Sequence, residues 1–177
     1  MATTTWNLDA SHSDVGFKVR HLMITNVKGR FEKFTATAIT EDDQFETAKI
    51  KLEVEVNSIN TGNEQRDGHL KAADFFDTEH HPSITFESEG MTKVKENEYK
   101  VMGNLTVKGI TKSIEVFAIV SELVKDPWGQ TKVGFEVTTK IDRADYGLVW
   151  NAPLETGGLL LSDDVYLHAD VQFIKAQ

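Results

Sequence analysis

The stretch KIKLEVEV, residues 49–56, gives the clearest indication of the fold class, because polar and apolar side chains alternate through its whole length. Ile50, Leu52, Val54 and Val56 share one side of an extended chain, and the charged residues between them share the other. A period of two is typical of a strand with one face in a core and one in solvent. The stretch therefore predicts a half-buried β-strand.

The same alternation recurs on both sides of this stretch. Further inward-facing positions fall in five segments: Val15, Phe17 and Val19; Ile84 and Phe86; Tyr99, Val101, Leu105 and Val107; Val133, Phe135, Val137 and Ile141; and Val165, Leu167, Val171 and Phe173. The breaks near Glu41, Lys95, Gly109 and Pro127 are short and rich in turn residues. Parallel neighbours would need much longer connections, so the strands are predicted to be antiparallel.

Helical periodicity is confined to residues 63–76, NEQRDGHLKAADFF. Many long antiparallel strands leave two open sheet edges unless the sheet closes on itself. We therefore expect an all-β fold in which residues 1–177 form a single domain. The predicted architecture is an antiparallel barrel of about eight to ten strands, wide enough to hold a ligand, with one or two short helices.

Composition excludes several classes of function. The chain has no cysteine, which removes disulfides, cysteine-ligated metals and thiolate nucleophiles. Its net charge of -9 would repel nucleic acid and anionic membranes. No apolar run is long enough to cross a bilayer. The first residues, MATTTWNLDASHSD, lack the pattern of a secretory signal, so the sequence as it stands predicts a cytoplasmic protein.

No motif predicts catalysis, a metal or a cofactor. His12 and Ser13 are neighbours and would point to opposite faces of an extended chain, so they cannot form a proton-transfer pair. DTEHH, residues 77–81, lacks the spacing of a zinc helix and is expected to be a solvated loop. GNLTVKG, residues 103–109, lacks the Lys-Ser/Thr pair of a phosphate-binding loop.

The segment RDGHL places polar and charged groups beside aromatic ones. Arg66, Asp67 and His69 fall on the expected helix, close to Phe75 and Phe76. In one interpretation these polar groups meet the head group of an amphiphile at the barrel mouth. In the other, Arg66 and Asp67 fasten the helix to the rim, through Asp142 and Arg143 or through Asp145.

Four segments in order resemble one known family. WNLDASHSDVGFKVRH, INTGNEQRDGHLKAADFFDTEHHPSITFES, GNLTVKGITKSIE and DRADYGL are similar to the YceI-like polyisoprenoid-binding family, and the similarity runs from Trp6 to the last strand. The resemblance implies an extended, lipocalin-like barrel whose apolar interior holds an isoprenoid chain or another long-chain amphiphile, such as an isoprenoid quinone. It also implies a homodimer. Many members are exported, so a leader removed ahead of residue 1 would place this chain in the periplasm.

We therefore expect a binding protein for a long-chain isoprenoid or fatty lipid, serving transport, storage or sequestration. The alternatives are an enzyme acting on an isoprenoid lipid and a stress-related interaction protein with an incidental cavity. Ten Phe residues, against three Trp and three Tyr, suit an apolar interior. The expected ligand contacts are Phe17, Val19, His21, Val54, Arg66, Asp67, His69, Leu70, Phe75, Phe76, Phe86, Leu105, Phe117, Phe135 and Val137.

Two features of the sequence are consistent with the dimer. The strands that begin at Ser113 and Asp164 are expected to carry apolar residues on both faces, as at Ile114, Val116, Phe117 and Ile119, so a helix, a loop or a second subunit must cover part of the outer wall. The segment APLETGGLLLSDD, residues 152–164, joins two glycines, Gly157 and Gly158, to three leucines, Leu159, Leu160 and Leu161. This segment is expected to form a second rim loop or part of the dimer contact.

Overall fold

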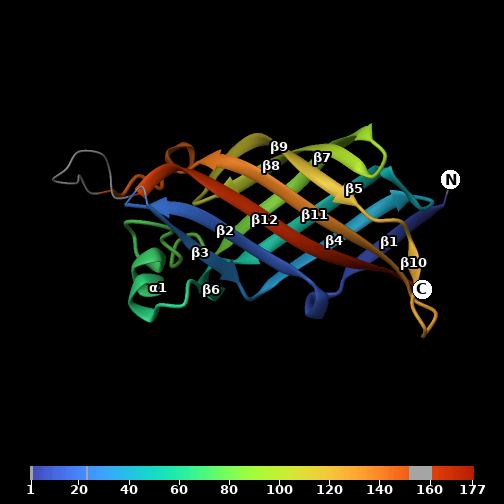
Figure 1. Cartoon of the computed structure of the whole chain (residues 1–177), viewed down its shortest axis with the longest axis horizontal. Helices are drawn as coiled ribbons and strands as arrows, with labels where there is room; N and C mark the ends of the chain where they lie inside the picture. The colour runs from blue at the N-terminus through green and yellow to red at the C-terminus, as the bar shows by residue number, and fades with distance from the viewer. Residues whose placement is uncertain (1, 23, 152–160) are drawn as a thin grey trace.

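The computed structural model describes residues 2–22, 24–151 and 161–177, and most of these lie in β-strands (Figure 1). The strands are β1 Thr3–Leu8, β2 Asp14–His21, β3 Thr25–Phe31, β4 Phe34–Glu41, β5 Gln44–Glu55, β6 Ile59–Asn60, β7 Ser83–Lys95, β8 Glu98–Val107, β9 Ile110–Val120, β10 Val124–Lys125, β11 Thr131–Asp142 and β12 Leu161–Lys175. The helix α1 spans Glu64–Lys71, and short 3₁₀ turns cover Ala10–His12 (η1), Val56–Ser58 (η2) and Arg143–Tyr146 (η3).

Eight strands form a closed antiparallel barrel. They follow one another in the hydrogen-bonded order β11, β9, β8, β7, β5, β4, β1, β12, and pairing of β11 with β12 closes the ring. The hairpin between β8 and β9 turns at Lys108 and Gly109, both of which have positive φ. The prediction of an all-β antiparallel barrel is confirmed.

The long strand β12 extends the wall beyond the closed ring. Along one edge it pairs with β11, and along the other it pairs first with β2 and then with β1. Strand β3 adds to β2, and β6 adds to β3. In Figure 1 these added strands lie toward α1, at the opposite end of the barrel from both chain termini.

Side chains fill the barrel near the chain termini. Trp6, whose backbone pairs with Lys175, is fully buried, and its ring centroid lies 4.9 Å from that of Phe45. Phe135 contacts Phe45 at 5.3 Å and Phe173 at 5.6 Å. This end of the barrel is therefore a packed aromatic core.

The helix is shorter than the sequence suggests. Asn63 caps its first turn, since the Asn63 side chain accepts a hydrogen bond from the Arg66 backbone N–H at 3.0 Å. The helix stops after Lys71 because Ala72 is extended, and residues 72–77 form turns in place of the predicted continuation to residue 76. These turns bring Phe75 and Phe76 back toward the barrel.

The outer faces of β9 and β12 differ. On β9, Phe117 and Ile119 point outward, and each is 49% exposed. On β12 the apolar residues Val165, Leu167 and Val171 all occupy odd-numbered, inward-facing positions. Most of the even-numbered positions, which face outward, are polar. The expectation of apolar residues on both faces is therefore right for β9, whereas on β12 it is met on the outer face by Tyr166, which is 48% exposed, among mostly polar neighbours.

Candidate functional site

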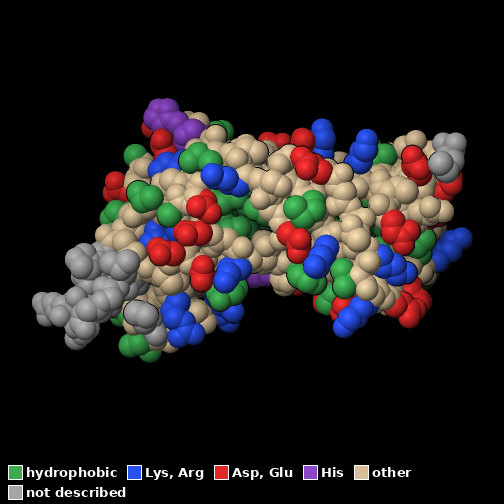
Figure 2. Space-filling view, turned by 90° about the horizontal axis from the view of Figure 1, so that it is seen from above, with side chains coloured by type: hydrophobic (Ala, Val, Ile, Leu, Met, Phe, Trp, Pro, Cys, Tyr) green, Lys and Arg blue, Asp and Glu red, His purple; other side chains and the backbone are tan. Residues whose placement is uncertain are grey.

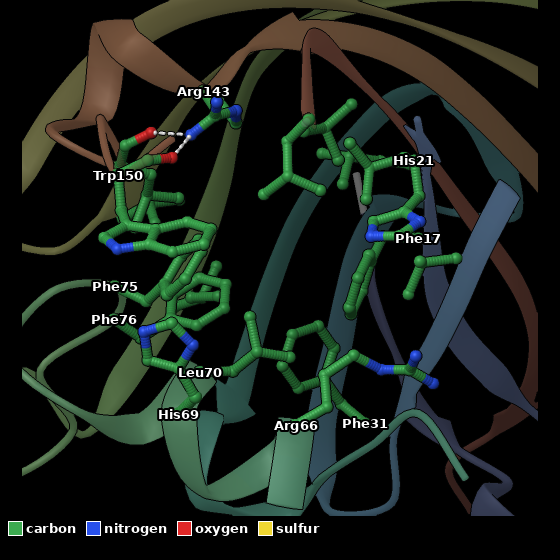
Figure 3. A pocket seen from close by; sticks show the side chains of 18 of the residues that line it. Phe17, His21, Phe31, Arg66, His69, Leu70, Phe75, Phe76, Arg143 and Trp150 are labelled. Atoms are coloured by element: carbon green, nitrogen blue, oxygen red, sulfur yellow. Dashed lines mark hydrogen bonds between the residues drawn. The ribbon is translucent and has the colours of Figure 1, made fainter. Parts of the chain in front are cut away.

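A cavity of about 570 Å³ lies at the α1 end of the barrel (Figure 3). It is bounded by inward side chains of β2, β3, β7, β8, β11 and β12, by α1 and the turns after it, and by the segment that follows η3. Its lining residues are Phe17, Val19, His21, Val27, Phe31, Asn63, Gln65, Arg66, His69, Leu70, Phe75, Phe76, Ile84, Val107, Ile141, Arg143, Leu148, Trp150, Leu161, Val165 and Leu167.

The exposure pattern of the inward residues follows this hollow. Val133 and Phe135 on β11 are buried, whereas Ile141, farther along the same strand, is only half-buried. The same change occurs along β12, from buried Phe173 to half-buried Leu167. Inward residues near the termini have close-packed neighbours, and those near α1 border open volume. The barrel is thus solid at one end and hollow at the other.

Thr61 fastens α1 over the hollow end. Its hydroxyl donates to the Asp67 carboxylate and accepts from Arg66 Nε at 2.8 Å. The Thr61 backbone N–H donates to Asp67 at 2.9 Å, and its carbonyl accepts from Arg66 Nη2 at 2.8 Å. Both predicted anchors therefore hold the helix, but through Thr61, and the expected ties to Asp142, Arg143 or Asp145 are wrong.

Aromatic rings join α1 to the segment after η3. The His69 ring lies 5.0 Å from Phe75 and 4.9 Å from Trp150, edge-on to both. Phe76 makes an edge contact with Phe31 of β3 at 6.4 Å. In Figure 3 these rings surround the hollow, with Leu70 projecting between them.

Arg143 adds a buried cation to the cavity wall. It is 4% exposed and donates to three backbone carbonyls: Ser162 at 2.9 Å, Leu148 at 2.6 Å and Trp150 at 2.8 Å. Burial lowers the pKa of its guanidinium, and the nearby carboxylates of Asp163 and Asp142 oppose that shift. These hydrogen bonds tie the chain after η3 to the start of β12.

Eight of the predicted ligand contacts line the cavity: Phe17, Val19, His21, Arg66, His69, Leu70, Phe75 and Phe76. Four others, Val54, Phe86, Leu105 and Val137, pack in the hydrophobic clusters around it without reaching the hollow. Asp67 faces Thr61 instead of the cavity.

The structure corrects the prediction that Phe117 and Phe135 contact the ligand. Phe117 lies on the outer face of β9, where the Lys100 Nζ sits 5.8 Å from its ring centroid. Its neighbours Val116 and Ala118 take the inward positions. Phe135 does point inward, but into the packed core near the termini. Neither ring lines the cavity.

Sequence reasoning missed Arg143 and Trp150 as cavity residues. The inward positions of β11 are odd-numbered, so continuing the same parity past Ile141 would have pointed Arg143 inward. No periodic signal could have found Trp150, which follows a turn. The expectation for residues 152–164 falls mostly outside the described residues, which resume at Leu161, and Leu161 lines the cavity.

The polar clusters identified in the sequence form local contacts. Ser13 donates to the Asp9 carbonyl, and His12 Nδ1 contacts both Asp9 and Ser11, so one ring nitrogen meets both partners. Asp77 pairs with His80 at 3.0 Å and raises the pKa of that histidine through the hydrogen bond. Across the described residues, no three His, Asp or Glu side chains gather as metal ligands.

In the described part of the chain, no helix is long and apolar enough to cross a bilayer.

Known proteins resemble this chain in both sequence and fold. UPF0312 protein SA2479 of Staphylococcus aureus is 39% identical over 171 residues, which is 96% of this chain and 97% of that protein. The crystal structure of the Campylobacter jejuni YCEI protein is 34% identical with a TM-score of 0.78, covering 96% of each chain.

A more distant structure shows the fold alone. It is described as a polyisoprenoid binding domain from Saccharophagus degradans, implicated in plant cell wall breakdown. It is 16% identical to this chain with a TM-score of 0.71, and covers 97% of this chain and 98% of its own. The family description YceI-like domain matches residues 6–173, nearly the whole length. Because the family match covers residues 6–173 and a relative is 39% identical over 96% of the chain, this chain belongs to the YceI-like domain family.

Proposed function

We propose that this protein binds one long-chain amphiphilic lipid, a polyisoprenoid or a related isoprenoid quinone, for transport, storage or sequestration. The apolar tail would lie in the cavity beneath α1, and residues 1–177 would act as a single binding unit. The observation that carries the proposal is the cavity itself, an apolar hollow of about 570 Å³ in a barrel otherwise filled by side chains. The description of the Saccharophagus degradans domain as polyisoprenoid binding supports it.

The energetics suit a reversible carrier. Burying about 400 Å² of tail at roughly 25 cal/mol per Å² would contribute about 10 kcal/mol. Association costs at least about 4 kcal/mol, which leaves a net binding free energy of about 6 kcal/mol at most and a Kd of roughly tens of micromolar. Each added methylene that enters the cavity should contribute about 0.8 kcal/mol, which is roughly a fourfold gain in affinity.

The lining favours binding over chemistry. Among the described residues, the cavity is lined by no Ser, Thr, Cys, Tyr, Lys, Asp or Glu side chain. His21 and His69 could accept a proton, but neither has a nucleophile beside it in that lining. We therefore propose a binding protein in preference to an enzyme acting on an isoprenoid lipid.

Tryptophan fluorescence gives a direct test, because the three tryptophans occupy different environments. Trp150 lines the cavity, Trp6 is buried at the solid end, and Trp128 is 84% exposed. In a Trp128→Phe variant, a bromine-labelled alkyl chain should quench Trp150 saturably and with about one chain per protein. Adding Trp150→Phe should remove most of the quenching. Quenching that persists in the double variant, or does not saturate, would contradict a chain in the cavity.

We also propose a homodimer that uses the outer face of β9. Phe117 and Ile119 expose apolar surface there, which a partner would cover. Light scattering at micromolar concentration should give twice the mass of one chain, and Ile119→Lys should restore the monomer. A wild-type protein that scatters as a monomer at this concentration would refute the dimer.

A further inference from the structure

The ionisable groups that line the cavity are all basic. They are Arg66, Arg143, His21 and His69; among the described residues the lining includes no acidic side chain, and the nearest acidic partner of this group is Asp74, whose Oδ2 lies 3.8 Å from His69 Nε2 outside the lining. The chain as a whole carries 28 acidic against 19 basic residues. In Figure 2 acidic and basic side chains are mixed over the face that is in view. The ionisable side chains of the cavity lining are thus basic, although the protein as a whole is acidic.

Arg143 carries its charge without an acidic partner in contact. Its Nε and Nη1 donate to backbone carbonyls, which are neutral acceptors. Within residues 2–22, 24–151 and 161–177, it forms no ion pair, and its Nη2 has no hydrogen-bond partner. Asp142 and Asp163 influence it only through space. A buried cation with no acidic side chain in direct contact is costly, and an anion that reaches it is correspondingly stabilised.

Arg66 repeats this arrangement at the helix. Its guanidinium is held by the hydroxyl and carbonyl of Thr61, while Asp67 also bonds Thr61 and forms no ion pair with Arg66 in the described structure. Figure 3 places Arg66 and Arg143 on opposite sides of the hollow, with Leu70 and Phe17 between them. Charge-assisted hydrogen bonds to an oxyanion are strong in such a weakly hydrated site.

We propose that the cavity selects amphiphiles whose head group is an oxyanion, a carboxylate or a phosphate monoester. Arg143 binds the head group, and Arg66 adds a weaker attraction from the α1 side. The apolar chain then lies along Phe17, Leu70 and the neighbouring apolar side chains. This inference rests on the proposed lipid-binding function and narrows it, because an isoprenoid with a carboxylate or phosphate head group is then favoured over a neutral quinone.

A head-group series on the unmodified cavity tests the inference. Dodecanoate, dodecyl phosphate, dodecanol and dodecylamine have the same chain and compete with the brominated probe for quenching of Trp150. Both oxyanions should bind about tenfold or more tightly than the alcohol, and the amine should bind weakest. The relative affinity of carboxylate and phosphate distinguishes a fatty acid from a phosphorylated lipid as the source.

The outcomes separate this inference from the proposed function. If the alcohol matches the acids, or the amine binds tightest, the head-group selection is wrong while the apolar cavity remains a binding site. If none of the four displaces the probe and the probe itself does not bind, the proposed function fails as well.

Substitution of Arg143 tests its role separately from folding. Arg143→Gln should bring the ratio of acid to alcohol affinity close to one, whereas a purely structural arginine would weaken both ligands equally and leave the ratio unchanged. Arg30→Gln is the matched control, because Arg30 is outside the cavity lining and pairs with Glu32. If Arg143→Gln does not fold, Arg143→Lys keeps the charge and should keep the ratio. A ratio that survives in Arg143→Gln would overturn the assignment.

Discussion

Replacing Phe135 with alanine should destabilise the protein and leave lipid binding nearly unchanged. Phe135 is 3% exposed, and its ring packs against Phe45 and Phe173 in the solid end of the barrel. Truncating a buried Phe to Ala in a close-packed core costs about 3–5 kcal/mol. For a protein of this size, each kcal/mol shifts the melting temperature by about 2–4 °C, so the expected fall is roughly 6–20 °C.

Leu70→Ala is the matched variant from the hollow end. Leu70 is half-buried on α1 and borders the cavity, so its truncation leaves less new void than truncation in a packed core. The lost contact with the chain should weaken binding by about 1–2 kcal/mol, or roughly five- to thirtyfold. Its melting temperature should fall by less than that of Phe135→Ala.

The assay measures thermal unfolding of both variants and titrates the brominated chain at a temperature where each is folded. We expect Phe135→Ala to lose stability and Leu70→Ala to lose affinity. If Phe135→Ala weakens binding as much as Leu70→Ala does, the chain reaches the end that we describe as solid, and the division of the barrel is wrong.

Three further predictions concern the attachment of α1, the effect of metal removal on stability, and the pKa of His80. Thr61→Val should speed amide hydrogen exchange in α1, because Arg66 and Asp67 each lose a hydrogen bond to the hydroxyl; unchanged exchange would contradict this anchor. EDTA should leave the melting temperature unchanged, and a drop restored by zinc would reveal a site. His80 should titrate above its ordinary pKa of 6.5, by NMR, and Asp77→Asn should remove the shift. That pair stabilises the fold while His80 is protonated and Asp77 is ionised, so its effect is lost as pH rises through the raised pKa of His80 and as pH falls through the lowered pKa of Asp77.

Alternation in the sequence predicts which way a strand residue faces but not what it meets there. Phe17 and Phe135 both occupy inward positions of alternating segments, yet Phe17 lines the hollow and Phe135 packs in the core. That difference depends on how far the barrel is filled from each end, which is a property of all the strands together. The sequence therefore predicts which side chains face the barrel interior, but it does not predict where along the barrel the cavity lies.

The remaining errors arise where periodicity is ambiguous or ends. Phe117 stands in a run that is apolar on both faces, so its orientation could not be read from its neighbours. Thr61 gives no local sign that it would bond both Arg66 and Asp67, since only the folded loop brings their atoms together. Arg143 follows the last residue of its strand, just beyond the predicted pattern.

A crystal structure of the protein with a brominated dodecanoate tests the central claim most directly, because anomalous scattering locates the bromine independently of the protein. We expect bromine density inside the cavity among Phe17, Leu70 and Trp150. Bromine on the outer face of β9 near Phe117, or between Trp6 and Phe173 at the solid end, would contradict it.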